Sequence, residues 1–181
     1  IKIGDPMAGE TEMGPLAIPG QLQRVEEYVQ AGLDEGAKLV FGGRRPEGLG
    51  KGWYYTPTIF EDASNQMKIA QEEIFGPVLT VIPFRGEEEV VKLANESKYG
   101  LASGIWTSNV GKAHRVAKAI RAGIVWVNTY RSISPIAPIG GVKFSGYGRE
   151  GGWEAIYEYT QSKVVWVNTS TEPMPDPFIM R

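Results

Sequence analysis

The chain has 181 residues, a net charge of −2 and 42% hydrophobic residues, which are ordinary values for a globular protein of one domain. This charge gives no electrostatic basis for binding nucleic acid or an anionic membrane, and no run approaches the ~18 apolar residues of a membrane span. The absence of cysteine excludes disulfides and a cysteine nucleophile within the chain. The single histidine, His114, excludes a histidine-rich metal site.

The first third of the chain predicts one helix followed by two strands. After an extended start rich in glycine and proline, a helix is expected over 21–35. Strands are expected at 38–41 and 54–60, and Pro57 favours a sheet edge for the second of them. The helix is indicated by apolar residues at three- and four-residue steps, namely Leu22, Val25, Val29 and Leu33.

The middle of the chain alternates strands and helices. Its strands read as nearly continuous apolar runs, which is typical of strands buried on both faces of a parallel sheet. Strand, helix, strand, helix, strand at these lengths is the signature of βαβ units, so the pattern predicts an α/β fold with a parallel sheet. The elements expected in this order are strand 76–84, helix 87–97, strand 101–108, helix 110–123 and strand 124–128.

The last third predicts a loop rich in proline and glycine over 132–152, a short helix over 153–159 and a final strand over 163–168. Within the loop, GYGREG at 146–151 has the Gly-x-Gly-x-x-Gly spacing of a dinucleotide-binding turn. That turn requires a preceding strand and an acid at the end of the next strand. The preceding residues favour a loop and the next strand ends in Asn168, so we expect a simple glycine-rich turn.

The segment QEEIFGPVL at 71–79 places two adjacent carboxylates before a Gly-Pro turn and an apolar strand. Neighbours on an extended segment point to opposite sides, so Glu72 and Glu73 are not expected to form an acid/base pair. A carboxylate facing a cleft accepts hydrogen bonds from a diol such as a ribose. Phe75 is expected on the same side as Glu73, where its ring could lie beside a planar heterocycle. From these residues alone, the alternative is that Glu72 and Glu73 are solvated charges before a strand.

EEIFGPV resembles the signature of the aldehyde dehydrogenase superfamily. Other segments resemble that family in the same order, and the likeness covers nearly all of the chain. It corresponds to the C-terminal part of a family subunit and implies an α/β fold with the Rossmann-like parallel open sheet of the catalytic domain, followed by a C-terminal intersubunit strand. The further segments are GDPMAGETEMGPLA, GWYYTPTIF, YGLASGIWT, AGIVWVNTY, PIGGVKFSGYGRE and YTQSKVVWV.

The resemblance implies oxidation of an aldehyde to a carboxylic acid with NAD or NADP through a cysteine thioester. Nucleophilic catalysis splits the reaction, and the cofactor carries the redox chemistry. By the same resemblance, Glu73 binds the hydroxyls of the nicotinamide ribose and Phe75 borders the nicotinamide. Gln21 and Arg24 are expected to approach the adenosine–ribose side of the cofactor.

The loop after AGIVWVN lines the aldehyde tunnel in the family, and the matching positions are Tyr130, Arg131, Ile133 and Ile139. The family often has an aromatic residue at the position of Ile139, so this departure leaves the choice of substrate open. Arg131 could hold an aldehyde that bears a carboxylate, because a guanidinium pairs well with that group. An arginine on a surface loop is an equally good interpretation.

The resemblance also implies the organisation of the chain. Residues 1–160 are expected to be the C-terminal portion of the catalytic domain, and 161–181 an oligomerisation strand and tail that gives a homodimer or homotetramer. The family's cysteine lies upstream, so this chain alone is expected to be an inactive fragment that needs the N-terminal part of its own subunit. The full protein is expected in the cytoplasm. The alternative is a truncated, non-catalytic homologue that acts as an oligomerisation or binding module.

Overall fold

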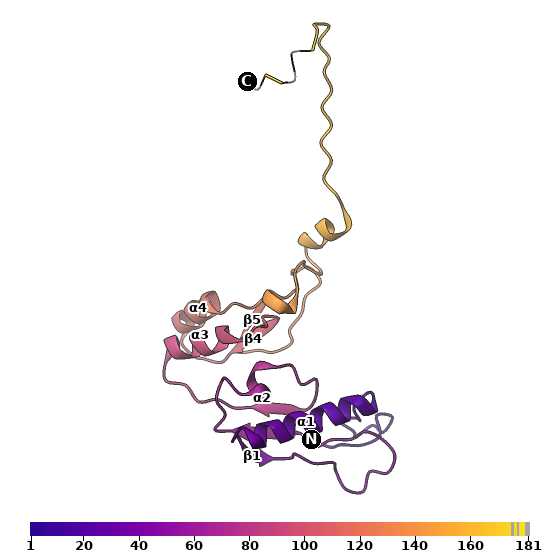
Figure 1. Cartoon of the computed structure of the whole chain (residues 1–181), viewed down its shortest axis with the longest axis vertical. Helices are drawn as coiled ribbons and strands as arrows, with labels where there is room; N and C mark the ends of the chain where they lie inside the picture. The colour runs from indigo at the N-terminus through magenta and orange to yellow at the C-terminus, as the bar shows by residue number, and fades with distance from the viewer. Residues whose placement is uncertain (175, 177, 180–181) are drawn as a thin grey trace.

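A computed structural model describes residues 1–174, 176 and 178–179 of the chain. It consists of two α/β units that follow one another in sequence and an extended C-terminal segment that projects away from both (Figure 1). No helix within the described part of the chain is both long and apolar enough to cross a membrane. The α/β organisation expected from the alternating pattern is thus confirmed.

The first unit is a three-stranded sheet with two helices. The strand order is β1-β2-β3, in which β1 pairs antiparallel with β2 and β2 pairs parallel with β3. The first helix begins at a proline, whose fixed φ suits the first helical position. The elements are α1 (Pro19–Asp34), β1 (Lys38–Phe41), β2 (Thr58–Glu61), α2 (Lys68–Gln71) and β3 (Val78–Thr80).

The core of the chain lies in this unit, where α1 packs on the sheet. Val25 of α1 and Phe60 of β2 have no exposed surface, and Tyr28 is 5% exposed. A fully buried aromatic and a fully buried aliphatic side chain stabilise the unit by removing apolar area from water. The remaining buried members of this cluster are Leu22, Val29, Ala37, Tyr55, Ala63, Ile69 and Ile74.

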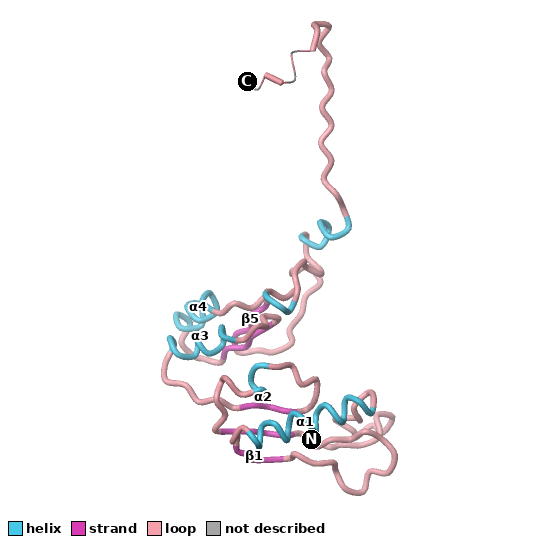
Figure 2. Tube along the Cα trace, viewed as in Figure 1, coloured by secondary structure: helices cyan, strands magenta, loops and turns pink. Residues whose placement is uncertain are grey.

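The second unit is smaller and contains a two-stranded parallel sheet. Each strand follows a helix, so the βαβ connection predicted for this region is confirmed. Figure 2 shows both helices beside the sheet and the second unit above the first. The side chains of Asn65 and Gln66, in the first unit, donate hydrogen bonds to the last turn of the helix Glu87–Glu96 in the second unit. The elements are α3 (Glu87–Glu96), β4 (Ala102–Ile105), α4 (Val110–Ala119) and β5 (Ile124–Val127).

The strands among the described residues differ from the expectation in three respects. The described residues form two separate small sheets instead of one open parallel sheet, and one strand pair is antiparallel. The strand expected at 54–60 begins only at Thr58, because Pro57 has no N–H to donate to a ladder. Once Pro57 lies outside the strand, it no longer restricts the strand to an edge, and β2 is the central strand of its sheet.

The C-terminal region differs from its prediction in one respect. The short helix expected over 153–159 is present as a 3₁₀ helix, η2 (Glu154–Tyr159). Residues 163–168, predicted as a strand, are extended but have no hydrogen-bonded neighbour within the described chain. Their apolar side chains are exposed, with 92% of Trp166 accessible. A single extended segment cannot form a ladder without a second strand, so strand character here requires a partner.

The loop that contains GYGREG is a turn without a preceding strand, as predicted. A 3₁₀ turn, η1 (Lys143–Ser145), comes before it, and Gly146, Gly148 and Gly151 all have positive φ. The loop packs on the start of β4, where the Gly100 N–H donates to Ser145 Oγ at 3.0 Å. The glycines of this loop therefore allow backbone conformations with positive φ that other residues rarely adopt.

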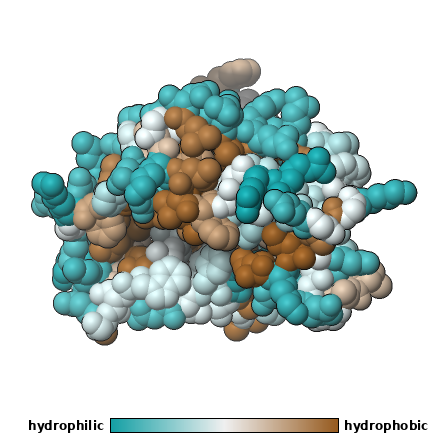
Figure 3. Space-filling model, turned by 90° about the horizontal axis from the view of Figure 1, so that it is seen from below, coloured by the Kyte–Doolittle hydropathy of each residue, from teal (hydrophilic) through white to brown (hydrophobic). Residues whose placement is uncertain are grey.

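The outer strands of the first sheet keep apolar side chains at the surface. Seen from below, hydrophobic side chains gather among hydrophilic ones on the first unit (Figure 3). Val40 and Phe41 of β1 are 50% and 60% exposed, and Leu79 of β3 is 57% exposed. The helices of the chain thus cover this sheet only in part.

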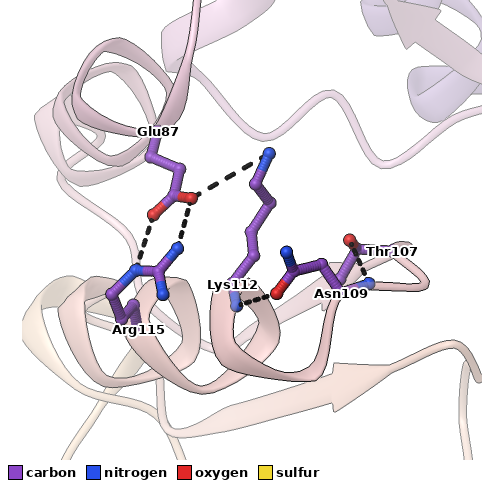
Figure 4. A network of polar contacts seen from close by, with 5 residues as sticks. All are labelled: Glu87, Thr107, Asn109, Lys112 and Arg115. Atoms are coloured by element: carbon purple, nitrogen blue, oxygen red, sulfur yellow. Dashed lines mark hydrogen bonds and ion pairs between the residues drawn. The ribbon is translucent and has the colours of Figure 1, made fainter.

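An ion pair joins the two helices of the second unit. The Glu87 carboxylate accepts hydrogen bonds from Arg115 Nε at 3.1 Å and Nη2 at 2.7 Å, and Lys112 Nζ lies 3.9 Å away (Figure 4). The helix that carries Lys112 and Arg115 is itself capped by Asn109, which accepts from the Lys112 N–H. The two-bond contact with Arg115 holds the pKa of Glu87 below its ordinary value and raises the pKa of Arg115.

This ion pair predicts a stability loss in acid. Because the folded-state pKa of Glu87 lies below its ordinary value of 4.5, the pair stabilises the protein above about pH 4.5 and stops doing so as pH falls through the lowered pKa. In the protein that carries this chain, Glu87→Gln should lower the melting temperature at pH 7, and this difference should shrink as pH falls below 4.5. Glu88→Gln, an exposed neighbour without an ion pair among the described residues, is the control. A difference that stays constant as the pH is lowered through the acid range would contradict the prediction.

Candidate cofactor and substrate site

The EEIF segment forms a tight turn between α2 and β3, which we call the 72–76 turn. Helix α2 ends at Gln71, and Glu72 is extended with φ −115° and ψ 150°. Phe75 has a φ of +58°, a conformation that a bulky L-residue rarely adopts. The predicted alternation of side chains therefore stops at Phe75, because the backbone turns there.

Helix α1 donates hydrogen bonds to three successive carbonyl groups of this turn. Gln21 Nε2 donates to the oxygens of Ile74 and Phe75, at 2.8 and 2.6 Å. Arg24 Nη2 donates to the Glu73 carbonyl at 2.8 Å. The two α1 residues predicted to lie near a cofactor are thus brought together with Glu73 and Phe75, and their N–H groups contact the backbone of the turn.

Tyr28 connects the same helix to the first residue of the turn. Its hydroxyl donates to Glu72 Oε2 at 2.6 Å and accepts from Arg24 Nη2 at 3.1 Å. Lys68 Nζ lies 4.7 Å from the centre of the Tyr28 ring, within the range of a cation–π contact. The hydrogen bond from Tyr28 lowers the pKa of Glu72 and, together with burial, raises the pKa of Tyr28. The Glu72 carboxylate is therefore ionised, and it joins the turn to α1.

Glu73 and Phe75 lie on the wall of one cleft, of about 380 Å³, over α2 and β3. The Phe75 ring is 72% exposed, and the Glu73 carboxylate has no hydrogen-bond or ion-pair partner among the described residues. An accessible carboxylate beside an accessible aromatic ring suits a ligand with hydroxyl groups and a planar ring. The residues present therefore fit the nucleotide that the resemblance implies.

The turn also lines a second cleft, of about 360 Å³. Glu72 and Glu73 line it together with Leu101 at the start of β4, Arg121 after α4 and Ser145 of the glycine-rich loop. Glu73 thus borders both clefts and faces both units. Within the described residues, no group of His, Asp and Glu side chains is arranged to hold a metal ion.

The predicted substrate residues fall into two groups. Tyr130, Arg131 and Ile133 are exposed in the loop after β5, where the Tyr130 ring packs edge-on against Trp126 with centroids 5.5 Å apart. Ile139 lines a third cleft, of about 380 Å³, and the other three residues do not. Its backbone pairs with that of Glu150 through two hydrogen bonds of 2.7 Å. None of the three clefts is lined by all four residues.

The third cleft adjoins the second. Leu101 and Ser145 line both, so the wall beside Glu73 continues into the cavity beside Ile139. The guanidinium of Arg149 fixes this region by donating to the carbonyls of Gly141 and Gly148, at 3.0 and 2.6 Å. A ligand that extends from Glu73 toward Ile139 would therefore pass the start of β4.

Comparison with known proteins decides the family. The model of the aldehyde dehydrogenase family matches residues 1–165. The chain belongs to the aldehyde dehydrogenase family. It is 48% identical over 171 residues to a betaine aldehyde dehydrogenase of Bacillus subtilis, covering 93% of this chain and 35% of that protein.

Two further comparisons agree. A (Z)-2-((N-methylformamido)methylene)-5-hydroxybutyrolactone dehydrogenase of Acinetobacter baylyi is 48% identical over 182 residues, covering all of this chain and 37% of that protein. The NAD+ complex of an aldehyde dehydrogenase from Bacillus cereus superposes with a TM-score of 0.89 and 48% identity, over 94% of this chain and 34% of that one. The chain therefore spans about a third of the aldehyde dehydrogenases that it matches.

The sequence analysis of this aldehyde dehydrogenase chain did not find two parts of the candidate site. Tyr28, which binds Glu72, was not singled out, and Gly76 was treated only as part of a Gly-Pro turn. A signal for Tyr28 exists, because Gln21, Arg24 and Tyr28 recur at three- and four-residue steps and so share one helix face. No sequence pattern indicates that Gly76 touches α1, because that contact is tertiary.

The close approach of Gly76 to α1 gives a second prediction. A Cβ atom at Gly76 would overlap Cγ2 of Val25, which is fully buried and has no room to move. Gly76→Ala should therefore destabilise the protein by ~1–3 kcal/mol, the usual cost of overpacking. In a Val25→Ala background the same change should cost much less, because the overlapping methyl is gone. Thermal unfolding of the four proteins in this cycle measures the coupling, and additive effects would show that the contact is absent.

Proposed function

We propose that this chain is part of an NAD(P)-dependent aldehyde dehydrogenase that oxidises an aldehyde to a carboxylic acid through a cysteine thioester. The chain has no cysteine. By its likeness to the family, the nucleophile of the proposed enzyme would lie upstream of these residues, in an N-terminal part of the same subunit. The observation that carries the proposal is the 72–76 turn, which presents Glu73 and Phe75 on one cleft wall within a chain of this family.

In this proposal Glu73 accepts hydrogen bonds from the nicotinamide ribose hydroxyls, and Phe75 borders the nicotinamide ring. NAD or NADP, once bound, supplies the hydride-accepting chemistry. Gln21 and Arg24 would lie toward the adenosine–ribose side of the bound cofactor, with their side-chain N–H groups donating to the backbone of the turn. The support is the accessible carboxylate of Glu73, which has free acceptor capacity, and the 72% exposure of the Phe75 ring.

The aldehyde would enter along the cavity that runs from the start of β4 toward Ile139. Tyr130, Arg131 and Ile133 would line the same path in the complete subunit, as in the family. Ile139 is aliphatic where the family is often aromatic, so this position leaves the choice of aldehyde open. The guanidinium of Arg131 is exposed and would select for a carboxylate-bearing aldehyde.

The complete subunit would also extend the fold. Residues 1–160 would be the C-terminal portion of the catalytic domain, in which upstream strands join the two small sheets into a Rossmann-like open sheet. Residues 161–181 would carry the oligomerisation strand. The support for this organisation is the share of each relative that the chain covers, together with the β3 and β4 strands that lie at the ends of separate sheets.

The cofactor proposal is tested by Glu73→Gln in the full-length protein. The amide keeps the size of the side chain but replaces one acceptor oxygen with a donor and removes the charge, so ribose hydroxyls are held less well. We expect the KM for NAD+ to rise or kcat to fall by about tenfold, the equivalent of one lost charge-assisted hydrogen bond. Steady-state rates with NAD+ and with NADP+ on a panel of aldehydes, betaine aldehyde included, measure the effect.

Glu88→Gln is the matched control, because Glu88 is an exposed glutamate of α3 outside the three clefts. Unchanged kcat and cofactor KM in Glu73→Gln would remove Glu73 from the site. The absence of NADH or NADPH formation by the wild-type protein with any aldehyde of the panel would overturn the proposed activity itself.

We further propose that residues 163–168 add to the sheet of another copy and give a homodimer or homotetramer. The support is an extended segment whose apolar side chains, Val164 to Val167, are at least 73% exposed. A second candidate function rests on the same segment, namely a non-catalytic oligomerisation or binding module. The two functions are distinguished by aldehyde oxidation, which only the first predicts.

The strand proposal predicts that Val165→Pro lowers the oligomeric mass. Proline removes an N–H from the ladder and clashes with a neighbouring strand, whereas Val165→Thr keeps the backbone and the β-branched shape. Light scattering coupled to size exclusion should give a smaller species for the proline variant at micromolar concentration and the wild-type mass for the threonine variant. Equal masses for all three proteins would show that assembly does not use this strand.

A further inference from the structure

We propose that Gln21, Arg24 and Tyr28 form a clamp on α1 that positions Glu73 and Phe75 for the cofactor, so that they act as positioning residues. This inference rests on the proposed cofactor role of Glu73 and Phe75. It assigns the three α1 side chains a task that differs from direct contact with a nucleotide. Their polar atoms contact the turn itself, and the turn carries the two residues that face the cleft.

The clamp begins with the carbonyl groups of the turn. A turn between a helix and a strand leaves backbone carbonyls without ladder or helical partners, and such groups must be satisfied elsewhere. Those of residues 73, 74 and 75 accept hydrogen bonds of 2.6–2.8 Å from Gln21 and Arg24, two side chains on one face of α1. Three consecutive bonds to one rigid helix leave the turn little freedom to rotate.

The clamp also holds a strained residue. Phe75 has a φ of +58°, which an aromatic residue adopts only where the surroundings enforce it. Gln21 binds the carbonyl of Phe75, and the next residue, Gly76, lies so close to Val25 that only glycine fits. Gln21 also binds the carbonyl of Ile74, so its two hydrogen bonds flank the strained φ torsion of Phe75 and restrict the direction in which the Phe75 ring projects.

Tyr28 anchors the other end of the turn. Its side chain is 5% exposed, so its hydroxyl has a fixed position from which to donate to Glu72 and accept from Arg24. Glu72 directly precedes Glu73, so fixing its side chain limits the direction of the Glu73 side chain. The two adjacent glutamates thus have separate tasks: Glu72 binds the helix, and Glu73 faces the clefts.

A fixed turn favours cofactor binding because a preorganised site loses less conformational entropy on binding. Loss of the clamp should therefore weaken NAD+ binding and hydride transfer without changing contacts to the aldehyde. A residue that merely stabilised the fold would lower thermal stability and would not separate cofactor from aldehyde in this way.

The test uses full-length enzyme with Gln21→Met and Tyr28→Phe, each of which keeps the size of the side chain and removes its hydrogen-bonding group. Gln23→Met is the matched control, because Gln23 lies on the same helix and bonds only Glu27 on the exposed side. We expect Gln21→Met to raise the Kd for NAD+, measured by calorimetry, about tenfold, and Tyr28→Phe to raise it by a smaller factor. The KM for the aldehyde should stay within about twofold, and Gln23→Met should match the wild type.

Arg24 provides a rescue experiment. Arg24→Met should weaken NAD+ binding, and Arg24→Lys should restore part of it, because an ammonium group can still donate to the Glu73 carbonyl. Hydrogen–deuterium exchange over residues 72–80 tests the clamp without reference to catalysis. Exchange there should be faster in Gln21→Met and Tyr28→Phe than in Gln23→Met.

The outcomes separate the two proposals. An active wild-type enzyme in which Gln21→Met and Tyr28→Phe bind NAD+ as Gln23→Met does would overturn the clamp and leave the proposed function intact. Lower melting temperature with unchanged NAD+ affinity would also overturn it, because the residues would then be structural only. A wild-type protein that neither binds NAD+ or NADP+ nor oxidises aldehydes would overturn the proposed function and the cofactor role of the clamp with it, whatever the exchange rates.

Discussion

The backbone carbonyls of residues 73–75 need hydrogen-bond donors that their own turn does not supply, and α1 supplies them. The same helix buries Val25 against Gly76 and contributes much of the core over the first sheet. One helix therefore carries both the packing of the first unit and the alignment of the candidate site. Its apolar face decides where it docks, and its polar edge decides how the turn is held.

The arrangement places the candidate site where residues of both units line one cleft. Glu73 borders two clefts, and Leu101 and Ser145 line both one of these and the cavity beside Ile139. The glycine-rich loop contributes by packing on residue 100, where large side chains would not fit. The glycines of this loop thus form part of a cavity wall. The Gly-x-Gly-x-x-Gly spacing reflects positions where the backbone has a positive φ, which glycine adopts readily.

The elements that could be predicted were those with strong local signals. The helices at 21–35, 87–97 and 110–123 follow from apolar periodicity, and each is found within a few residues of its expected ends. Strand lengths and sheet order were predicted less well, because they depend on which neighbours are available. Residues 163–168 show this most clearly, since their composition favours a strand but the described chain offers no partner.

The sequence by itself determined the family resemblance, the α/β pattern and the importance of EEIFGP, because short motifs and periodicity are local properties. Only the tertiary structure decided the contacts made within that motif. It joined Glu72 to Tyr28, left Glu73 at the clefts, and placed Ile139 in a cleft that Tyr130, Arg131 and Ile133 do not line. Those outcomes depend on contacts across some fifty residues of chain, such as Gln21 to Phe75, and a local pattern carries no record of which distant atoms meet.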